Sequence, residues 1–489
     1  MAGFREIFKA TSVYTILGFL PTASRIIVLP VFLKFLDITD FAYIGLNSLI
    51  ASILPLIMTL GLEHAYARLY FDYRSKPKLL KAFTSTTLLM ITGQAILFSL
   101  VLIPIGDPLF RSLFESERFT FNAFGISAVI MAVFFSINSL INAHFRSKKS
   151  VGAFALFSVG QFLLSLTAEC LAIIVYRANA ETVIWVRLIA NGSITLIFLI
   201  YMLWKNGILF EARFLRPSLR YALPLIPYTT FGLIFTNADR VMIENLDIVA
   251  LGAFNLAMAI ASISDSFMFA VQSATYPSIY ELFKQNIVTN AARIDQLYRL
   301  IGILVIIVIC LLIAATPVGI YCFLDKAYFV AVPIVPIILG GYVFRYLYIV
   351  YAEPLFYFKR TRRLPWLNIL SGSVSLLSNL ILIPLAGLFG AAVASVLAKF
   401  SQFSLTFHWY KKDDRVHFNL QYLVPLISVV FILCCLIPLS ITYSFPPVVV
   451  YTAYFVPLIF IITSVCLVMR TRLAKNKDVF SFRKLLDAI

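Results

Sequence analysis

Nine ionisable residues lie within apolar stretches of the sequence, where lipid would reject them. The bases are Arg25, Arg187, Arg240, Arg345 and Lys399, and the acids are Glu169, Asp239, Asp265 and Glu353. We expect Arg25, Arg345 and Lys399 about 15–20 Å from their helix ends, near mid-bilayer. Each would cost about 2.5–3.5 kcal/mol if it faced lipid. Because cations outnumber acids, the pattern predicts a shared polar cavity that accepts a negatively charged ligand.

The four acids have two interpretations. A desolvated carboxylate beside a cavity can bind a proton or a sodium ion and titrate during a transport cycle, so these acids are candidates for ion coupling. The alternative is charge balance with the cations, for example Glu353 with Lys399. Asp239 and Arg240 are sequence neighbours that point about 100° apart on a helix, so they do not simply neutralise each other.

Composition defines the elements that must position these side chains. Of the 489 residues, 61% are hydrophobic and 13% are charged, about half the usual share of charge. Apolar windows of about 20 residues predict an all-α integral membrane protein with fourteen helices. These are expected near 10–33, 41–66, 82–105, 120–144, 150–176, 184–204, 221–244, 250–276, 300–323, 332–356, 365–384, 388–409, 421–443 and 449–469. The six cysteines show no CxxC spacing, which argues against a disulfide framework or a metal site.

The basic residues predict the orientation. If both termini are cytoplasmic, 30 of the 40 Lys and Arg residues fall in cytoplasmic segments, five in outer loops and five within spans. This bias satisfies the positive-inside rule, so the net charge of +17 needs no nucleic-acid partner. Arg187 and Arg240 are then expected nearer the outer surface. Glu63 and Arg68 lie near the inner end of the second helix and are candidates for an inner gate, although Arg68 also fits a simple cytoplasmic anchor.

A repeat at an offset of 210 residues predicts two halves. The segments 36–38 (LDI) and 50–53 (IASI) recur as 246–248 and 260–263. Six helices per repeat is an even number, so both halves have the same topology and are related by an axis along the membrane normal. This arrangement predicts a central cavity between two six-helix lobes. We expect an N-lobe at 1–204, a cytoplasmic linker at 205–220, a C-lobe at 221–410, and two extra helices with a basic cytoplasmic tail at 411–489.

Three short segments carry a family resemblance, and the last is the most specific. They are GLEHAYARLYF at 61–71, NADR at 237–240, and NLILIPLAGLFGAAVAS at 379–395. In the last, Pro384 ends a helix, Gly387 allows a tight turn and the small residues from Gly390 to Ser395 permit close packing. Over about 1–410, the sequence resembles the Wzx-type polysaccharide flippases of the multidrug/oligosaccharidyl-lipid/polysaccharide (MOP) exporter superfamily, which translocate lipid-linked O-antigen and capsule units.

The resemblance implies a transporter rather than an enzyme. Its substrate would be an undecaprenyl-diphosphate-linked oligosaccharide, moved from the cytoplasmic to the outer leaflet of a bacterial inner membrane by alternating access. Similar flippases use a basic residue in the first helix, which makes Arg25 the first candidate for headgroup contact, with a lobe-bridging ion pair as the alternative. Interior arginines suit a diphosphate because they bind it bidentately. The resemblance also implies that the protein binds no cofactor and that a proton gradient, a sodium gradient or the membrane potential drives transport. Its expected partners are a polysaccharide polymerase and a chain-length regulator of lipopolysaccharide or capsule synthesis.

Three other functions compete with this one. A peptidoglycan-precursor (lipid II) flippase would carry the same lipid diphosphate, and such proteins often have fourteen helices. A MATE-like drug or cation antiporter would need an acid-dominated cavity. A membrane glycosyltransferase or polymerase would need catalytic acids on a sizeable aqueous loop, and the expected outer loops are too short for one.

Overall fold

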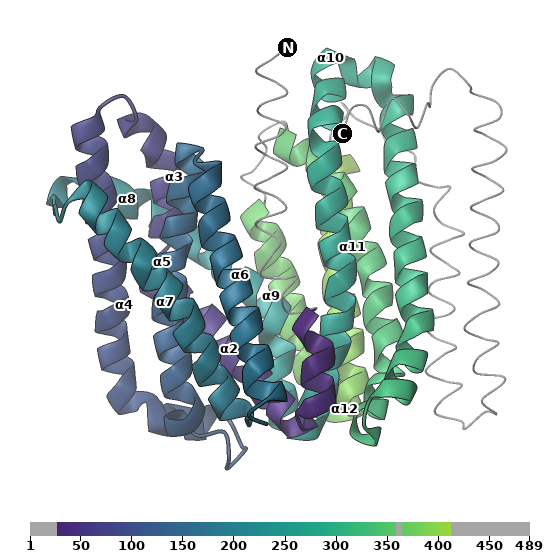
Figure 1. Ribbon diagram of the computed structural model, residues 1–489. Helices are drawn as coiled ribbons and strands as arrows, with labels where there is room; N and C mark the ends of the chain where they lie inside the picture. Colours follow the sequence, from purple (N-terminus) through teal and green to yellow (C-terminus); the bar gives the residue numbers. More distant parts are fainter. Residues whose placement is uncertain (1–26, 358–363, 412–489) are drawn as a thin grey trace, which may run out of the picture.

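A computed structural model describes residues 27–357 and 364–411 of the chain (Figure 1). Every regular element in these ranges is a helix, which confirms the all-α prediction. The longer helices are α2 (Ile38–Thr59), α3 (Leu62–Tyr73), α4 (Pro77–Leu113), α5 (Ile126–Lys148), α6 (Val151–Ile174), α7 (Ala180–Asn206), α8 (Leu215–Ala222), α9 (Ile226–Glu244), α10 (Ile248–Phe323), α11 (Ile334–Tyr357) and α12 (Leu364–Lys411). Short elements precede α5, α8, α9 and α11: η1 (Phe121–Gly125), η2 (Ala212–Phe214), η3 (Leu223–Leu225) and η4 (Lys326–Ala331).

The predicted spans from 41–66 to 388–409 all coincide with helices. Nine helical segments of the described chain are long and apolar enough to cross a membrane. One of them, Trp366–Lys411, contains two predicted spans, and α10 holds two spans, Ile248–Gln272 and Arg293–Phe323. The predicted span 221–244 corresponds to α9, which is not among the nine apolar segments. The spans 421–443 and 449–469, and most of 10–33, lie outside the described residues, so the number fourteen stays a prediction.

Two helices differ in detail from the predicted spans. The second span, expected at 41–66, is divided into α2 and α3 because Leu60 and Gly61 adopt positive φ angles of 50° and 72°. The two spans expected on either side of Gly387 form one element, α12, with a non-helical residue at Gly387 (φ 55°, ψ −129°). A Cβ at Gly390 would clash with the carbonyl oxygen of Leu382, so close approach requires a glycine there.

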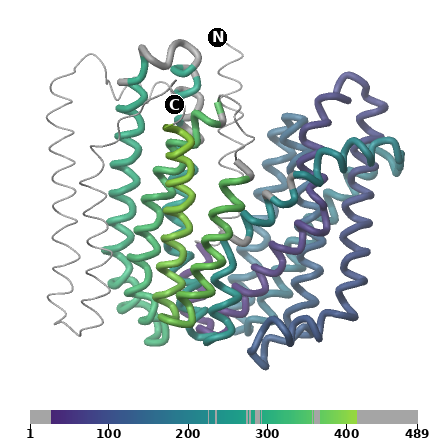
Figure 2. The backbone as a smooth tube through the Cα atoms, turned by 180° about the vertical axis from the view of Figure 1, so that it is seen from behind, coloured from purple at the N-terminus to yellow at the C-terminus, as the bar shows by residue number. Residues whose placement is uncertain are grey.

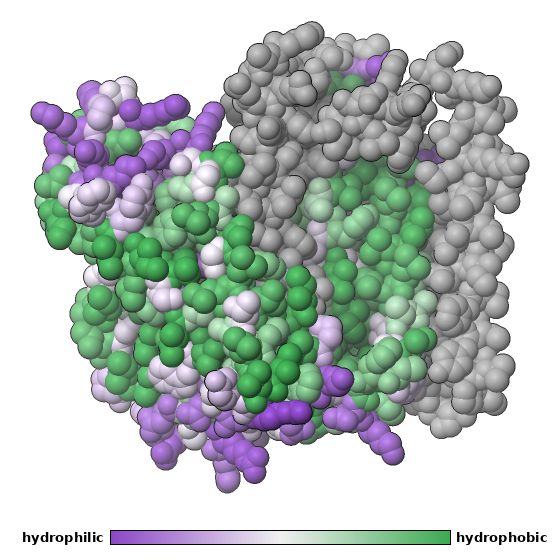
Figure 3. Space-filling model, in the orientation of Figure 1, coloured by the Kyte–Doolittle hydropathy of each residue, from purple (hydrophilic) through white to green (hydrophobic). Residues whose placement is uncertain are grey.

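The helices form two groups that meet at one end. Helices α3 to α7 lie on one side in Figure 1 and α9 to α12 on the other, and both views show the groups close together at the lower end and diverging towards the upper end (Figures 1 and 2). Below, "N-lobe" and "C-lobe" denote these two groups, with α2 counted in the N-lobe. A green apolar belt separates hydrophilic surfaces above and below, as expected for a protein surrounded by lipid (Figure 3).

The sequence repeat is visible where the lobes meet. Asp37 caps the start of α2 and Asp247, 210 positions later, caps the start of α10 through Val249 and Ala250. Helices α2 and α10 pack directly against each other. A Cβ at Gly45 would clash with Asn255, the residue at the equivalent position of the second repeat. Contact between equivalent positions is expected where two related helices cross at a shared axis.

A second contact joins the lobes at the lower end. Glu244 closes α9, is 3% exposed, and accepts hydrogen bonds from the backbone N–H groups of Glu115 (3.4 Å) and Ser116 (3.1 Å). Those two residues belong to the loop between α4 and η1, on the N-lobe side. A buried carboxylate that accepts two N–H groups holds the loop against α9. The lower end is therefore closed by α2 against α10 and by this carboxylate.

Candidate functional site

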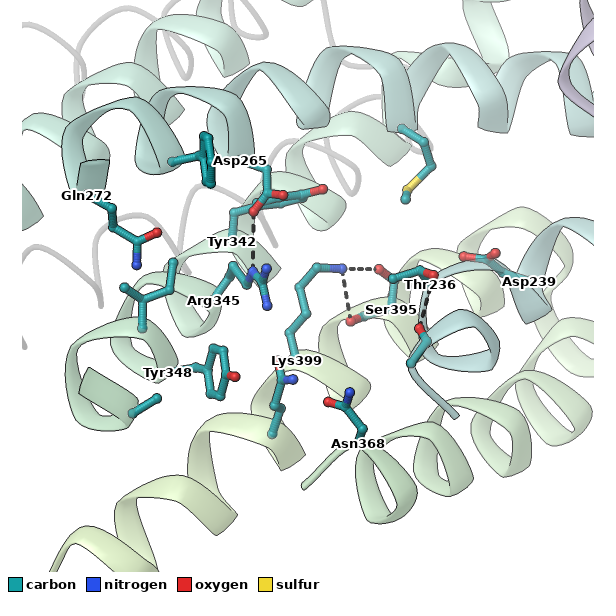
Figure 4. A pocket seen from close by; sticks show the side chains of 16 residues that line it. Thr236, Asp239, Asp265, Gln272, Tyr342, Arg345, Tyr348, Asn368, Ser395 and Lys399 are labelled. Atoms are coloured by element: carbon teal, nitrogen blue, oxygen red, sulfur yellow. Dashed lines mark hydrogen bonds and ion pairs between the residues drawn. The ribbon is translucent and has the colours of Figure 1, made fainter. Parts of the chain in front are cut away.

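A cavity of about 410 Å³ lies within the C-lobe among α9, α10, α11 and α12 (Figure 4). Four charged side chains line it: Asp239, Asp265, Arg345 and Lys399. Each comes from a different helix of the lobe, in the order α9, α10, α11 and α12. The volume falls within the range of about 300–1,000 Å³ that is usual for ligand sites. The lobe thus brings together two cations and two carboxylates that are up to 160 positions apart in the sequence.

Lys399 is the most buried cation of this cavity, with 9% of its surface exposed. Its Nζ donates to Ser395 Oγ at 2.6 Å and to the Ser395 carbonyl oxygen at 3.4 Å, and it lies 5.0 Å from the centroid of the Tyr342 ring. Ser395 is one helical turn earlier on α12, which explains the pairing. In the described part of the chain no carboxylate lies within 4.0 Å of this ammonium, although Asp239 is close enough to interact electrostatically. The hydrogen bonds of Lys399 that the structure describes thus go to Ser395 and not to Glu353.

Arg345 projects from α11 towards Asp265 on α10. Its Nε donates to Asp265 Oδ1 at 3.2 Å, and the guanidinium lies 5.4 Å from the centroid of the Tyr348 ring. Both side chains keep contact with the cavity, with exposed fractions of 31% for Arg345 and 46% for Asp265. The contact uses one edge of the guanidinium, so the two Nη groups still have donors for a ligand.

A second cavity, of about 480 Å³, lies mainly in the N-lobe. Helices α2, α5, α6 and α7 form most of its wall. The C-lobe contributes Arg240, Asn255, Met258, Ala259 and Ser262. Met258 also lines the C-lobe cavity, so the two cavities adjoin at this residue.

The neighbours Asp239 and Arg240 lie in different cavities. Asp239 lines the C-lobe cavity and Arg240 lines the N-lobe cavity, a divergence that follows from their 100° separation on α9. The Nη1 of Arg240 donates to Asn237 Oδ1 at 3.4 Å, while its buried Nε has no hydrogen-bond partner among the described residues. Arg240 therefore presents positive charge where the two lobes meet.

Arg187 and Glu169 form a compact ion pair in the N-lobe cavity. The Nε and Nη2 of Arg187 donate to the two carboxylate oxygens of Glu169 at 2.7 and 3.0 Å, and Nη1 donates to Ser48 Oγ at 3.1 Å. The exposed fractions are 18% and 8%. This bidentate pair spans α6 and α7 and uses most of the donors of Arg187, so it neutralises the cation inside the protein.

Removing one partner of this pair should destabilise the protein strongly. Glu169→Gln leaves the guanidinium buried without its countercharge, which costs about 3–5 kcal/mol when a buried pair is broken. The thermal unfolding midpoint in detergent should fall accordingly. The double variant Glu169→Leu/Arg187→Met, which removes both charges, should recover most of the loss. Equal midpoints for the single variant and the unmodified protein would contradict a structural role for the pair.

The cationic excess expected from the sequence is largely compensated. Among the described residues, the two cavities hold four cations and three carboxylates, because Glu169 and Asp265 pair with Arg187 and Arg345. Positive charge without an ion-pair partner is thus concentrated at Lys399 and Arg240. Arg25 lies outside the described residues.

Three other candidates from the sequence lie away from both cavities. Glu353 is buried on α11, near Tyr280 of α10. Glu63 lies in the first turn of α3, 3.6 Å from His64. Arg68 forms an exposed pair with Asp72 at 2.9 Å, one turn along α3. Neither Glu63 nor Arg68 is among the residues that line the two cavities, so their gate role stays a prediction.

Sequence reasoning missed the neutral polar lining of the N-lobe cavity. Polar residues that line this cavity are spaced four positions apart on two helices: Gln161, Ser165 and Glu169 on α6, and Asn138 and Asn142 on α5. Such spacing places polar groups along one face of a helix. A search for polar side chains at i, i+4 spacing within the apolar windows would have found them.

Two helical groups with adjoining polar cavities inside an apolar belt have the architecture of a membrane transporter. The chain belongs to the family described as polysaccharide biosynthesis protein, whose model matches residues 7–283, more than half of the chain. A search among curated proteins finds no match.

Solved structures share the fold. Lipid II flippase MurJ in an inward closed conformation has a TM-score of 0.68 at 14% identity, covering 94% of this chain and 99% of that one. A MATE in complex with MaL6 has a TM-score of 0.58 at 14% identity, covering 83% and 96%. A MOP-superfamily transporter from Pyrococcus furiosus has a TM-score of 0.53 at 14% identity, covering 83% and 94%. At such identities, the similarity establishes a MurJ- and MATE-like fold and leaves the substrate to the site.

Proposed function

We propose that this protein is a Wzx-type flippase, which moves an undecaprenyl-diphosphate-linked oligosaccharide from the cytoplasmic to the outer leaflet of a bacterial inner membrane. The upper end in Figure 1, where α3 and α8 lie, then faces the cytoplasm, as the distribution of basic residues predicts. Both termini are expected on the cytoplasmic side from the same distribution. The substrate unit would serve O-antigen, lipopolysaccharide or capsule synthesis. A polysaccharide polymerase and a chain-length regulator would act on the exported unit.

The observation that carries this proposal is the ammonium of Lys399. It lines a cavity, is 9% exposed, and its hydrogen bonds go to the neutral Ser395. A buried cation without a bonded carboxylate is costly unless a ligand supplies the negative charge. Arg345 lines the same cavity, and Arg240 lies beyond Met258. A diphosphate carries about two negative charges and can accept hydrogen bonds from several such donors.

The arrangement of the lobes supports alternating access. Contact at the lower end and divergence at the upper end are the geometry of a transporter whose site is closed towards one side. Substrate would enter from the cytoplasmic side, with its lipid tail in the bilayer and its polar part in the cavities. Opening of the lower end would require Glu244 to release the backbone of Glu115 and Ser116.

Reconstituted transport tests the proposal directly. The full-length protein in liposomes should translocate undecaprenyl-diphosphate-linked oligosaccharide, measured as the fraction of glycan that becomes accessible to a membrane-impermeant glycosidase. An imposed proton gradient, sodium gradient or membrane potential should accelerate the reaction if Asp265 or another cavity acid couples it. Failure to move this substrate, with successful transport of an organic cation, would instead favour an antiporter.

Lipid II is the second candidate substrate. The similarity to MurJ in fold favours it, and the phosphate-binding argument applies to it equally. The same liposomes loaded with lipid II separate the two functions. Faster translocation of lipid II than of the oligosaccharide-linked lipid would assign the protein to peptidoglycan synthesis.

A further inference from the structure

The N-lobe cavity differs in chemistry from the C-lobe cavity. Six side-chain amides line it: Asn47, Asn138, Asn142, Gln161, Asn191 and Asn255. Its charged lining residues are Arg240 and the ion-paired Arg187 and Glu169. A cavity with neutral donors and acceptors and an internally neutralised ion pair is suited to a neutral polar ligand.

Some of these polar groups are structural, and others have no partner. Asn47 donates to the Phe124 carbonyl oxygen and to Ser127, and Asn138 accepts from Thr195, so both hold helices together. Ser165 and Asn255, by contrast, are 8% and 7% exposed. The Oγ of Ser165 and the Nδ2 of Asn255 have no hydrogen-bond partner within the described chain.

Unpartnered buried polar groups call for an occupant. Nearly all buried polar atoms in proteins are hydrogen-bonded, so two orphans in one cavity indicate a ligand or water that completes them. Asn142 lines the same cavity and its side chain makes no hydrogen bond to another described residue. These three groups come from α5, α6 and α10, so they approach the cavity from different sides.

Aromatic rings lie beside the amides. Phe135 and Phe162 line the cavity from α5 and α6, and Phe41 lines it from α2. Flat apolar rings next to paired donors and acceptors match the two surfaces of a sugar, which has an apolar C–H face and hydroxyl groups around its edge.

We propose that the N-lobe cavity binds the neutral glycan of the substrate, through Asn142, Ser165 and Asn255. The inference rests on the proposed function, in which Lys399, Arg345 and Arg240 take the diphosphate. The two cavities adjoin at Met258, so one substrate molecule can place its glycan in the N-lobe cavity and its diphosphate at the junction of the lobes. The lobes thus divide the substrate: the N-lobe recognises the sugars and the C-lobe the phosphate.

A peptide is the competing occupant, because a lipid II headgroup carries one. A peptide with ionised groups would need cavity charges free to pair with them. Arg187 already donates hydrogen bonds to both carboxylate oxygens of Glu169. Among the described residues that line the N-lobe cavity, Arg240 is therefore the one cation that has no carboxylate partner. The neutral lining therefore favours sugars.

Separate binding of the two parts of the substrate tests the inference. The full-length protein in nanodiscs is titrated with two probes: the oligosaccharide released by mild acid from the lipid-linked pool of the native cells, and undecaprenyl diphosphate without sugar. The variant Asn142→Ala/Ser165→Ala should bind the oligosaccharide about tenfold more weakly, because two hydrogen bonds are lost. Its affinity for undecaprenyl diphosphate should be unchanged, which also shows that the variant is folded.

Gln94→Ala is the matched control. Gln94 lies on α4, has a buried unpartnered Oε1 and lines neither cavity, so its replacement should leave both affinities unchanged.

Unaltered oligosaccharide affinity in Asn142→Ala/Ser165→Ala would overturn the glycan site while undecaprenyl diphosphate binding still supports the proposed function. Tighter binding of a soluble muramoyl pentapeptide than of the oligosaccharide would overturn the choice of sugars. Absence of undecaprenyl diphosphate binding in the unmodified protein would overturn the proposed function itself.

Discussion

Cells carrying Lys399→Met/Arg345→Met are expected to export no surface polysaccharide, although the protein reaches the membrane in normal amount. Methionine keeps an unbranched apolar side chain, shorter than lysine or arginine, and removes the charge and the donors. Hydrogen bonds to charged groups contribute about 1.5–3 kcal/mol each, so losing one at each residue should weaken diphosphate binding by roughly 10²–10⁴-fold. Removing Arg345 also leaves Asp265 without its partner at 3.2 Å, which adds uncompensated negative charge to the site.

The readouts separate binding from folding. Polymer on the cell surface is measured by immunoblot, protein abundance by membrane fractionation, and affinity by titration with undecaprenyl diphosphate. Arg111→Met/Lys326→Met is the control, because it removes the same two charges from exposed positions outside both cavities. Normal polymer in the Lys399→Met/Arg345→Met strain would show that these cations do not hold the substrate.

The polar residues of the spans were predictable from the sequence as a set. Arg345 and Lys399 were expected at similar depth in a central cavity between the two lobes, whereas the structure places both in a cavity within the C-lobe. The physical reason is that lipid excludes charge, so any charged residue at mid-bilayer must face the interior. The helices themselves followed from apolar windows for the same reason.

The partners of those residues were not predictable. Glu169 and Arg187 lie on consecutive helices, 18 positions apart, and their pairing depends on how α6 and α7 rotate against each other. Ser395 was noted for its small size in a packing motif, whereas the structure shows it as the hydrogen-bond acceptor of Lys399. Depth in the membrane follows from position in the sequence, but rotation about a helix axis is determined by tertiary packing.

The contact between α2 and α10 leads to the second large effect. Gly252→Ala should hold the lower end open and stop transport. An ideal Cβ at Gly252 would lie 2.5 Å from Ile38 Cγ1 and 2.6 Å from the Ile38 carbonyl oxygen. The carbonyl belongs to the first turn of α2 and cannot rotate away, so the helices must separate. Overpacking of this kind costs typically about 1–3 kcal/mol, which shifts the population by about 5- to 150-fold away from the closed lower end.

Thiol accessibility detects this shift. Ser262 lines the N-lobe cavity, so a cysteine at this position reports access to the cavity. In a protein whose native cysteines are replaced, Ser262→Cys should react with an impermeant maleimide added from the outer side. The reaction should be faster when Gly252→Ala is also present. Gly93→Ala is the control, because no described heavy atom beyond the neighbouring backbone of its own helix lies within 4 Å of the added Cβ. Alanine in a helix interior is also more stable than glycine by about 0.5–1 kcal/mol. Gly45→Ala should have an intermediate effect, since the three atoms nearest to its Cβ belong to the movable side chain of Asn255. If Gly252→Ala labels and exports like the unmodified protein, the α2–α10 contact does not close the outer side.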